Sequence, residues 1–173
     1  MSAAGASLSS VGQLPLNEPV LDYAPGSTER AQLRAEIKRQ AAEQPVLPLV
    51  IGGARVETGK SVPVTAPHDH SLVLGARVEG DRGHVDRAIA AALAAKPAWS
   101  ALPLDERAAI FDRAADLLAG PLRQRLNAAT LLGQSKTPHQ AEIDASCELI
   151  DLLRFNSHYD KELAELPLRS PPG

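Results

Sequence analysis

The chain has 173 residues, of which 44% are hydrophobic and 23% are charged, a composition typical of a globular protein. Its net charge is −3, with 18 basic and 21 acidic residues, and only 3% of the residues are aromatic. These values exclude the basic surface and the aromatic stacking platform of a nucleic-acid-binding protein.

The cysteine content and the N-terminal composition bear on location. The one cysteine, Cys147, excludes a disulfide framework and a zinc site made of several thiolates. No apolar run approaches the roughly 20 residues that span a bilayer. The first 26 residues carry no Lys or Arg, whereas secretory signals and mitochondrial presequences need basic residues. We therefore expect a soluble, cytoplasmic protein without a membrane span.

The N-terminal part predicts little buried structure. Residues 1–16 are small and polar, without a period, which indicates a disordered arm. Residues 17–44 are expected to form an extended segment and then a peripheral helix. Ser27 is placed to cap this helix, which runs to about Glu43 and has few apolar positions.

Residues 45–78 are expected to form short β-strands, because β-branched residues are broken there by Gly and Pro. Gly52 and Gly53 suit a tight hairpin turn, which needs positive φ angles. A hairpin of this size is marginal alone, so it requires a partner surface.

Residues 79–163 are expected to form a helical cluster. Asp81 can cap its first helix, and Pro97 and Pro103 are expected to interrupt the helical pattern. Gly120 ends the second helix.

The third helix is expected to stop at Gly133, and its predicted apolar stripe consists of Leu122, Leu126, Ala129 and Leu132. Thr137 and Gln140 have the spacing of a capping box, which opens a last helix that runs to about Glu162.

The last helix is apolar over roughly two-thirds of its circumference, so we expect it to be covered on several sides. One face should hold Ile143, Cys147 and Ile150, and a second sector holds Ala145, Leu149, Leu152 and Leu153. The chain cannot easily supply this cover. We expect that part of the protein is missing or that a partner covers the helix, and residues 164–173 have the composition of a truncated linker.

Each candidate chemical group also has a structural interpretation. Cys147 lies in mid-helix without a histidine at contact spacing, as a buried structural cysteine would. The His68-Asp69-His70 run lacks further metal ligands at motif spacing and is typical of a turn. Gly52 and Gly53 lack the third glycine of a dinucleotide loop. These residues indicate no catalytic set, no metal site and no cofactor site in the chain.

One acidic stripe, formed by Asp144, Glu148 and Asp151, runs along the last helix. Such a stripe is usually a solvated face, but it could also hold an amine or a metal. Because the rest of the helix looks covered, Glu148 at the edge of the stripe could look into a cleft.

Ordered segments from residue 17 to the end carry a resemblance to a known family. They are Asn17–Val20, Gly26–Arg30, Ala88–Ala95 with Trp99, Asp105–Phe111, Ala114–Pro121, Gly133–Lys136, Gln140–Ala145, Glu148–Asp151 and Arg154–Asn156. In this order they resemble the L-glutamate γ-semialdehyde dehydrogenases, also called Δ1-pyrroline-5-carboxylate dehydrogenases, of the aldehyde dehydrogenase superfamily. The Asn-Glu-Pro start and the Glu-Leu-Ile-Asp segment point to this branch.

The resemblance implies an enzyme of proline degradation. It would oxidise L-glutamate γ-semialdehyde, which is in equilibrium with pyrroline-5-carboxylate, to L-glutamate with NAD as the hydride acceptor. In the family, the nucleophilic cysteine, the general base and the NAD-binding strands lie beyond the point where this chain ends, and Cys147 does not match the nucleophile. Glu148 matches a family glutamate near the amino group of the substrate, where a carboxylate would favour an amino-acid aldehyde.

The chain therefore looks like the N-terminal third of such an enzyme. It would be an α+β fragment, mostly helical with a small β-hairpin region, of a parent α/β aldehyde dehydrogenase fold. We expect it to be inactive and marginally stable alone, and the full enzyme to be a homo-oligomer. Two alternatives stay open: a non-catalytic binding or oligomerisation module that docks on a full-length dehydrogenase, and an aldehyde dehydrogenase for another substrate.

Overall fold

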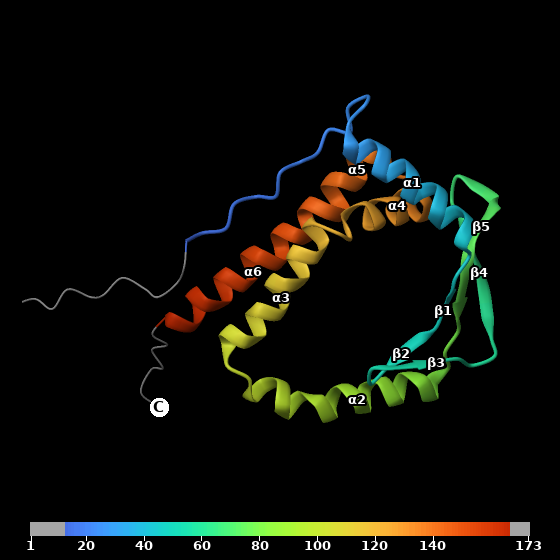
Figure 1. Cartoon of the computed structure of the whole chain (residues 1–173). Coiled ribbons are helices and arrows are strands. Elements are labelled where there is room, and N and C mark those ends of the chain that lie inside the picture. Colours follow the sequence, from blue (N-terminus) through green and yellow to red (C-terminus); the bar gives the residue numbers. More distant parts are fainter. Residues whose placement is uncertain (1–12, 167–173) are drawn as a thin grey trace, which may run out of the picture.

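The computed structural model describes residues 13–166 and shows an α+β chain that is mostly helical, as the sequence predicted (Figure 1). Most of the expected linker over 164–173 and most of the expected arm over 1–16 lie outside the described residues, but residues 164 and 165 belong to the last helix and not to a linker. The elements are α1 (Thr28–Glu43), β1 (Val46–Leu47), β2 (Leu49–Ile51), β3 (Ala54–Val56), β4 (Ser61–Ala66), β5 (Asp69–Val78), α2 (Arg82–Ala101), α3 (Leu104–Ala119), α4 (Arg123–Gln134), α5 (Pro138–Ala141), the π-helical turn η1 (Glu142–Cys147) and α6 (Glu148–Glu165).

The elements follow one another around a ring (Figure 1). Helix α3 packs along α6, and α1 packs on α4, while the strands lie on the far side and α2 connects the two regions. A small cluster of Tyr23, Leu33 and Ala128 joins the N-terminal segment, α1 and α4. The packing is therefore concentrated at the end of the molecule where α1, α4 and the segment before α1 meet.

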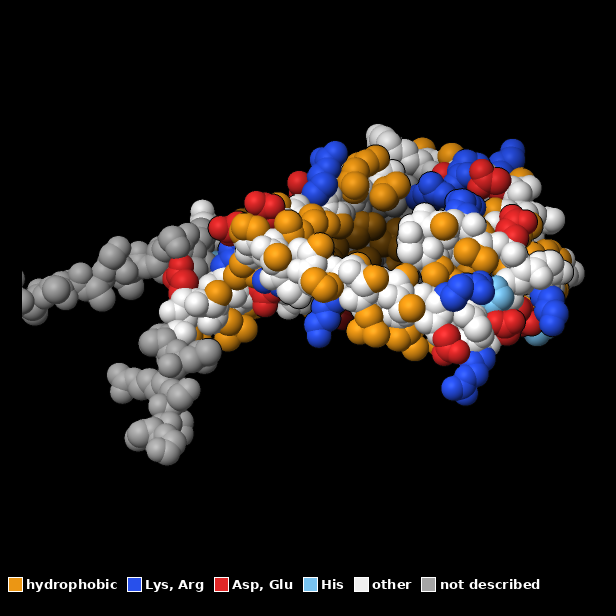
Figure 2. Space-filling view, turned by 90° about the horizontal axis from the view of Figure 1, so that it is seen from below, with side chains coloured by type: hydrophobic (Ala, Val, Ile, Leu, Met, Phe, Trp, Pro, Cys, Tyr) orange, Lys and Arg blue, Asp and Glu red, His pale blue; other side chains and the backbone are white. Residues whose placement is uncertain are grey.

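Helix α2 has no buried residue, although it carries apolar side chains. Val85, Ile89 and Leu93 are each more than half exposed, and they recur at helical contact spacing. Figure 2 views the molecule from the α2 side and shows hydrophobic side chains around a hollow. A helix in a protein gains most of its stability from packing against other elements, so α2 needs a surface that the described residues do not supply.

The strands form two small sheets. In the first, β4 pairs antiparallel with β5, and β1 lies parallel to β5 with Val46 opposite Ala76. In the second, β2 and β3 form a hairpin whose turn is Gly52 and Gly53, with φ angles of 59° and 80°. The predicted hairpin turn is confirmed.

The predicted helix starts are confirmed by their hydrogen bonds. The side chain of Ser27 accepts from Arg30 N–H, and that of Asp81 accepts from His84 N–H. Thr137 and Gln140 form the predicted capping box at the start of α5. In each of these three helices a local side-chain oxygen thus satisfies one free N–H group of the first turn, as expected.

Two predicted helix breaks are wrong. Pro97 lies inside α2, which continues to Ala101. The carbonyl that loses its partner to a proline can be solvated on an exposed helix, so the helix tolerates it there. The third helix continues through Gly133 to Gln134, and the left-handed residue that ends it is Ser135, with φ of 57°. Its Oγ lies 2.9 Å from Nδ1 of His68, a tertiary contact that fixes this end.

Gly75 offers a test of the larger sheet. It has φ of +151° beside an irregularity in the β4–β5 pairing, and an added Cβ would lie 2.4 Å from the carbonyl oxygen of Pro45. Gly75→Ala should destabilise the chain by about 1–3 kcal/mol through backbone strain and loss of the β1–β5 contact. Gly133→Ala is the control: its Cβ meets nothing within 4 Å, and a helical alanine should stabilise by up to about 1 kcal/mol. Urea unfolding of both variants measures the difference, and equal stabilities would contradict this account.

Candidate functional site

The chain before α1 lies along the last helical rod, formed by α5, η1 and α6 (Figure 1). We call residues 17–23 the strap. Asn17 Nδ2 and the backbone N–H of Glu18 donate to the two carboxylate oxygens of Asp151, both at 2.7 Å. At the other end of the strap, Leu21 N–H donates to Glu142 Oε1 at 2.9 Å. Both ends of the strap are therefore tied to the rod.

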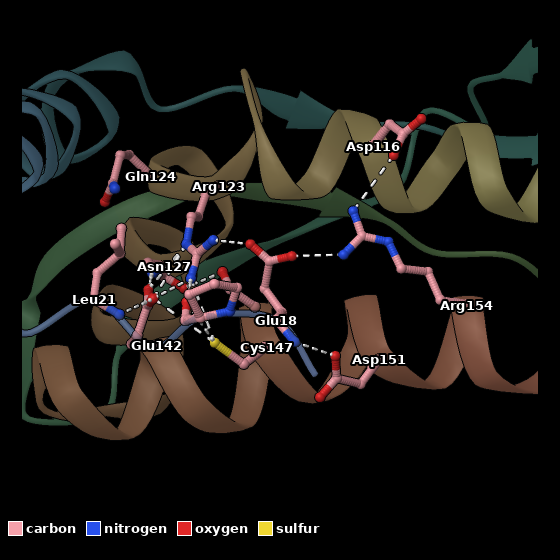
Figure 3. Close-up of polar contacts among 12 residues, drawn as sticks. Glu18, Leu21, Asp116, Arg123, Gln124, Asn127, Glu142, Cys147, Asp151 and Arg154 are labelled. Carbon is pink, nitrogen blue, oxygen red and sulfur yellow. Dashed lines mark hydrogen bonds and ion pairs between the residues drawn. The ribbon is translucent and has the colours of Figure 1, made fainter. Parts of the chain in front are cut away.

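Glu142 lies at the centre of a buried polar network (Figure 3). Its side chain has no solvent exposure, and it accepts hydrogen bonds from Arg123, from Asn127 Nδ2 at 2.8 Å and from Tyr23 OH at 2.7 Å. Burial alone would raise the pKa of this carboxyl. The bonds from Arg123, from Leu21 N–H and from Tyr23 outweigh burial and hold the pKa below its ordinary value of 4.5. Glu142 is therefore a buried, ionised carboxylate.

Arg123 joins this carboxylate to the strap (Figure 3). The guanidinium is itself buried; it donates to Glu18 at 2.5 Å and to the carbonyl oxygen of Pro19 at 2.7 Å. The other oxygen of Glu18 accepts from Arg154 at 2.6 Å, and Arg154 also reaches Asp116 on α3 at 3.4 Å. One chain of charges thus connects the strap with α3, α4, η1 and α6.

This network was not predicted from the sequence, because the pattern indicated an apolar face on α4. Of the predicted stripe only Leu132 is buried; the buried residues of α4 are Arg123, Asn127, Ala128, Thr130 and Leu132. The spacing of the polar residues could have indicated the network. Arg123 and Asn127 are four residues apart on α4, and Glu142 and Ser146 are four residues apart on the next helical segment, so each pair can lie on one face. Ser146 Oγ donates to Asn127 Oδ1 at 2.6 Å.

The π-helical turn η1 changes the face predicted for the last helix. Cys147 and Ile150 are buried as expected, but Ile143 is 39% exposed. A π-turn holds more residues than an α-turn, so Ile143, which lies in the turn, is rotated relative to the residues of α6 that follow it. Leu149 and Leu152, of the second predicted sector, are also exposed. Within the described residues these side chains are uncovered, as expected of a chain that cannot by itself supply the cover for its last helix.

An open groove of about 630 Å³ runs between the strap and the rod, and we call it the Glu148 groove. Its lining residues are Asn17, Glu18 and Val20 from the strap, and Ile143, Asp144, Cys147, Glu148, Asp151, Leu152 and Phe155 from the rod. The structure thus places all three residues of the predicted acidic stripe in one groove.

The groove carboxylates differ in what they contact. Glu18 is paired with Arg123 and Arg154, and Asp144 is paired with Lys136 at 2.8 Å. Asp151 accepts both of its hydrogen bonds from the strap. Glu148 is exposed, and its side chain makes no hydrogen bond or ion pair within the described part of the chain. It is the groove carboxylate left to meet a cation from outside.

Cys147 is not poised as a nucleophile. Its side chain is buried, and burial with the nearby charge of Glu142 raises the pKa of the thiol to about 11. Within residues 13–166, no group of three or more His, Cys, Asp or Glu side chains could hold a metal ion. Nor does any helix of that part combine the length and the apolar character needed to cross a bilayer.

Glu142→Gln should test the buried network. A neutral amide removes one of the two carboxylates that pair with the buried Arg123 guanidinium, so we expect a loss of about 3–5 kcal/mol in unfolding free energy. The exposed Glu57→Gln is the matched control and should change little. Because the pKa of Glu142 is lowered on folding, its contribution is present above pH 4.5 and lost as the pH falls through the folded value. The variant should therefore lose less stability in acid than the wild type, and identical acid profiles would contradict the assignment.

The Cys147 thiol should be unreactive in the folded chain. At pH 8 a thiol with a pKa of about 11 is almost wholly protonated, and burial also blocks reagents. Labelling with iodoacetamide, followed by mass spectrometry, should show no modification without denaturant and complete modification in guanidinium chloride. Rapid labelling of the folded chain would show that the residue is an accessible thiolate.

Comparison with known proteins places this geometry in a family. A model of the Aldehyde dehydrogenase family matches residues 55–170. The chain is 45% identical over 159 residues to a Δ1-pyrroline-5-carboxylate dehydrogenase of Agaricus bisporus, and the match covers 91% of the chain and 29% of that protein. It is 41% identical over 158 residues to the human mitochondrial Δ1-pyrroline-5-carboxylate dehydrogenase, and here the match covers 91% of the chain and 28% of that protein.

A solved structure shows the same arrangement. The Δ-pyrroline-5-carboxylate dehydrogenase from Mycobacterium tuberculosis superposes with a TM-score of 0.89 at 47% identity, over 97% of this chain and 31% of that chain. The chain thus spans less than a third of the length of these relatives. Because the family model covers most of the chain and the solved relative has its fold, the chain belongs to the aldehyde dehydrogenase family.

Proposed function

We propose that the chain is part of an NAD-dependent dehydrogenase that oxidises L-glutamate γ-semialdehyde to L-glutamate in proline degradation. The activity named for the relatives described above supports this proposal, and the structure of the M. tuberculosis enzyme has also been solved with NAD bound. Since the chain spans under a third of these proteins, the activity belongs to the proposed whole enzyme.

The observation that carries the proposal is the unpaired carboxylate of Glu148. The groove around it also presents the apolar side chains of Ile143, Leu152 and Phe155. A carboxylate beside apolar walls suits a ligand with an ammonium group on a short aliphatic chain. A charge-assisted hydrogen bond from the ammonium to Glu148 would select an amino-acid aldehyde over a plain aldehyde.

The residues described do not fit a dinucleotide. Such a site uses a glycine-rich loop between a strand and the N-terminus of a helix. Gly52 and Gly53 instead form the turn between β2 and β3, and a Cβ added at Gly52 would lie 3.5 Å from the Cβ of Ala91 on α2. Nor does Cys147 offer a thiolate. In this proposal the chain binds and orients the substrate, while residues outside it hold NAD and perform the covalent chemistry.

A second candidate function is a binding or oligomerisation module. The exposed apolar residues of α2, and Val46, Leu47 and Val50 on the strands, favour a partner surface. The partner would be the rest of a dehydrogenase or a second copy, and the whole enzyme would be a homo-oligomer. The cytoplasmic location expected from the sequence stays a prediction.

A chimera tests the substrate role. The 173-residue chain replaces its counterpart in the M. tuberculosis enzyme, and NADH formation is followed at 340 nm with L-glutamate γ-semialdehyde. Glu148→Gln should lower kcat/KM by about 10-fold to 100-fold, because a charged hydrogen bond becomes a neutral one. Glu106→Gln, an exposed change on α3, is the control and should leave kcat/KM unchanged. The chain alone should form no NADH.

The outcomes separate the candidates. A folded chimera that oxidises the amino-acid aldehyde equally well with and without the Glu148→Gln substitution would remove the role of Glu148. A folded but inactive chimera, together with co-purification of the chain with the intact M. tuberculosis enzyme, would favour the binding module.

A further inference from the structure

The strap forms one wall of the Glu148 groove. Asn17, Glu18 and Val20 face the residues of η1 and α6 across it. These strap residues precede the first helix and lie more than 120 positions from Glu148 in the sequence. The groove therefore exists only while the strap is attached to the rod.

Glu18 ties the strap to both sides of Glu148. Through Arg123 it is connected to Glu142, which lies six residues before Glu148 and begins the π-helical turn. Through Arg154 it is connected to α6, six residues after Glu148. The helical segment that carries Glu148 is thus held at both ends by one strap side chain.

The strap also occupies the neighbouring carboxylate. Asn17 Nδ2 and Glu18 N–H use both oxygens of Asp151, which follows Glu148 by about one helical turn. Without the strap, Asp151 would be a second unpaired carboxylate beside Glu148. A bound ammonium would then have two competing positions, and the reacting end of the ligand would be less well placed.

We propose that Asn17 and Glu18 are positioning residues for substrate selection: the strap occupies Asp151 and holds the Glu148 segment, so that one carboxylate receives the ammonium of the substrate. This inference rests on the proposed function and assigns the strap a role in it.

The test compares two aldehydes in the chimera. L-glutamate γ-semialdehyde carries the ammonium, and 5-oxopentanoate is the same chain without it. Asn17→Ala and Glu18→Gln should each lower the ratio of the two kcat/KM values by about 10-fold to 100-fold, as expected for a misplaced ligand. The loss should come from the amino-acid aldehyde alone, mainly through KM. Asn156→Ala, an exposed amide on α6 outside the groove, is the matched control and should keep the ratio.

Combination with Glu148→Gln makes the inference specific. If the strap acts through Glu148, adding Asn17→Ala to Glu148→Gln should lower the ratio no further. An equal loss for both aldehydes would mean a purely structural strap and would overturn the inference, although the proposed function would stand. A ratio that is unaffected by Glu148→Gln would remove the role of Glu148 and overturn this inference, whereas a folded chimera that forms no NADH would count against the proposed function itself.

A second measurement does not depend on the chimera. In the 173-residue chain, the amide N–H of Glu18 should be protected from hydrogen exchange, and Asp151→Ala should abolish that protection while the amides of α4 keep theirs. A Glu18 amide that exchanges freely in the wild type would show that the strap is not attached, which overturns the inference.

Discussion

The ionised carboxylate of Glu142, buried without solvent contact, constrains the helical end of this molecule. A buried charge is tolerated only when hydrogen bonds and an opposite charge replace its hydration, and the partners come from separate parts of the chain. Arg123 and Asn127 come from α4, and Leu21 and Tyr23 come from the segment before α1. Displacing any of these elements would leave a charge or a donor unpaired, so the network holds one arrangement of the strap, α4 and the rod.

The opposite end of the molecule has no such constraint. Helix α2 and the short strands expose apolar side chains, and the described residues provide no common core for them. The chain spans under a third of the relatives it matches, and in the proposed whole enzyme the remaining two-thirds would offer surface to cover these faces. The contrast has a simple physical basis: hydrogen-bonded charges fix geometry through direction, whereas apolar faces need only area and accept whatever surface covers them.

The two ends also divide the proposed function. The polar end presents a free carboxylate, and it does so on a segment whose position is set by the buried network. The thiol beneath the groove is protonated and buried, so this end suits recognition of a substrate and not attack on it. The same ionic contacts thus serve folding and the proposed selectivity. A mutation in them should therefore be tested for its effect on stability and for its effect on substrate selectivity.

Local signals determined much of this structure from the sequence alone. Caps at Ser27, Asp81 and Thr137, and the glycine turn between β2 and β3, act within a few residues, and the ordered segments identified the family. The acidic stripe with Glu148 was also visible as a pattern. Tertiary structure decided which polar residues are buried, because the donors to Glu142 include the N–H of Leu21, 121 positions away. Tertiary structure also decided the π-helical turn and the exposure of Ile143. The hydrophobic period of the last helix could not predict them, because it carries no information on the distant partners that hold Glu142.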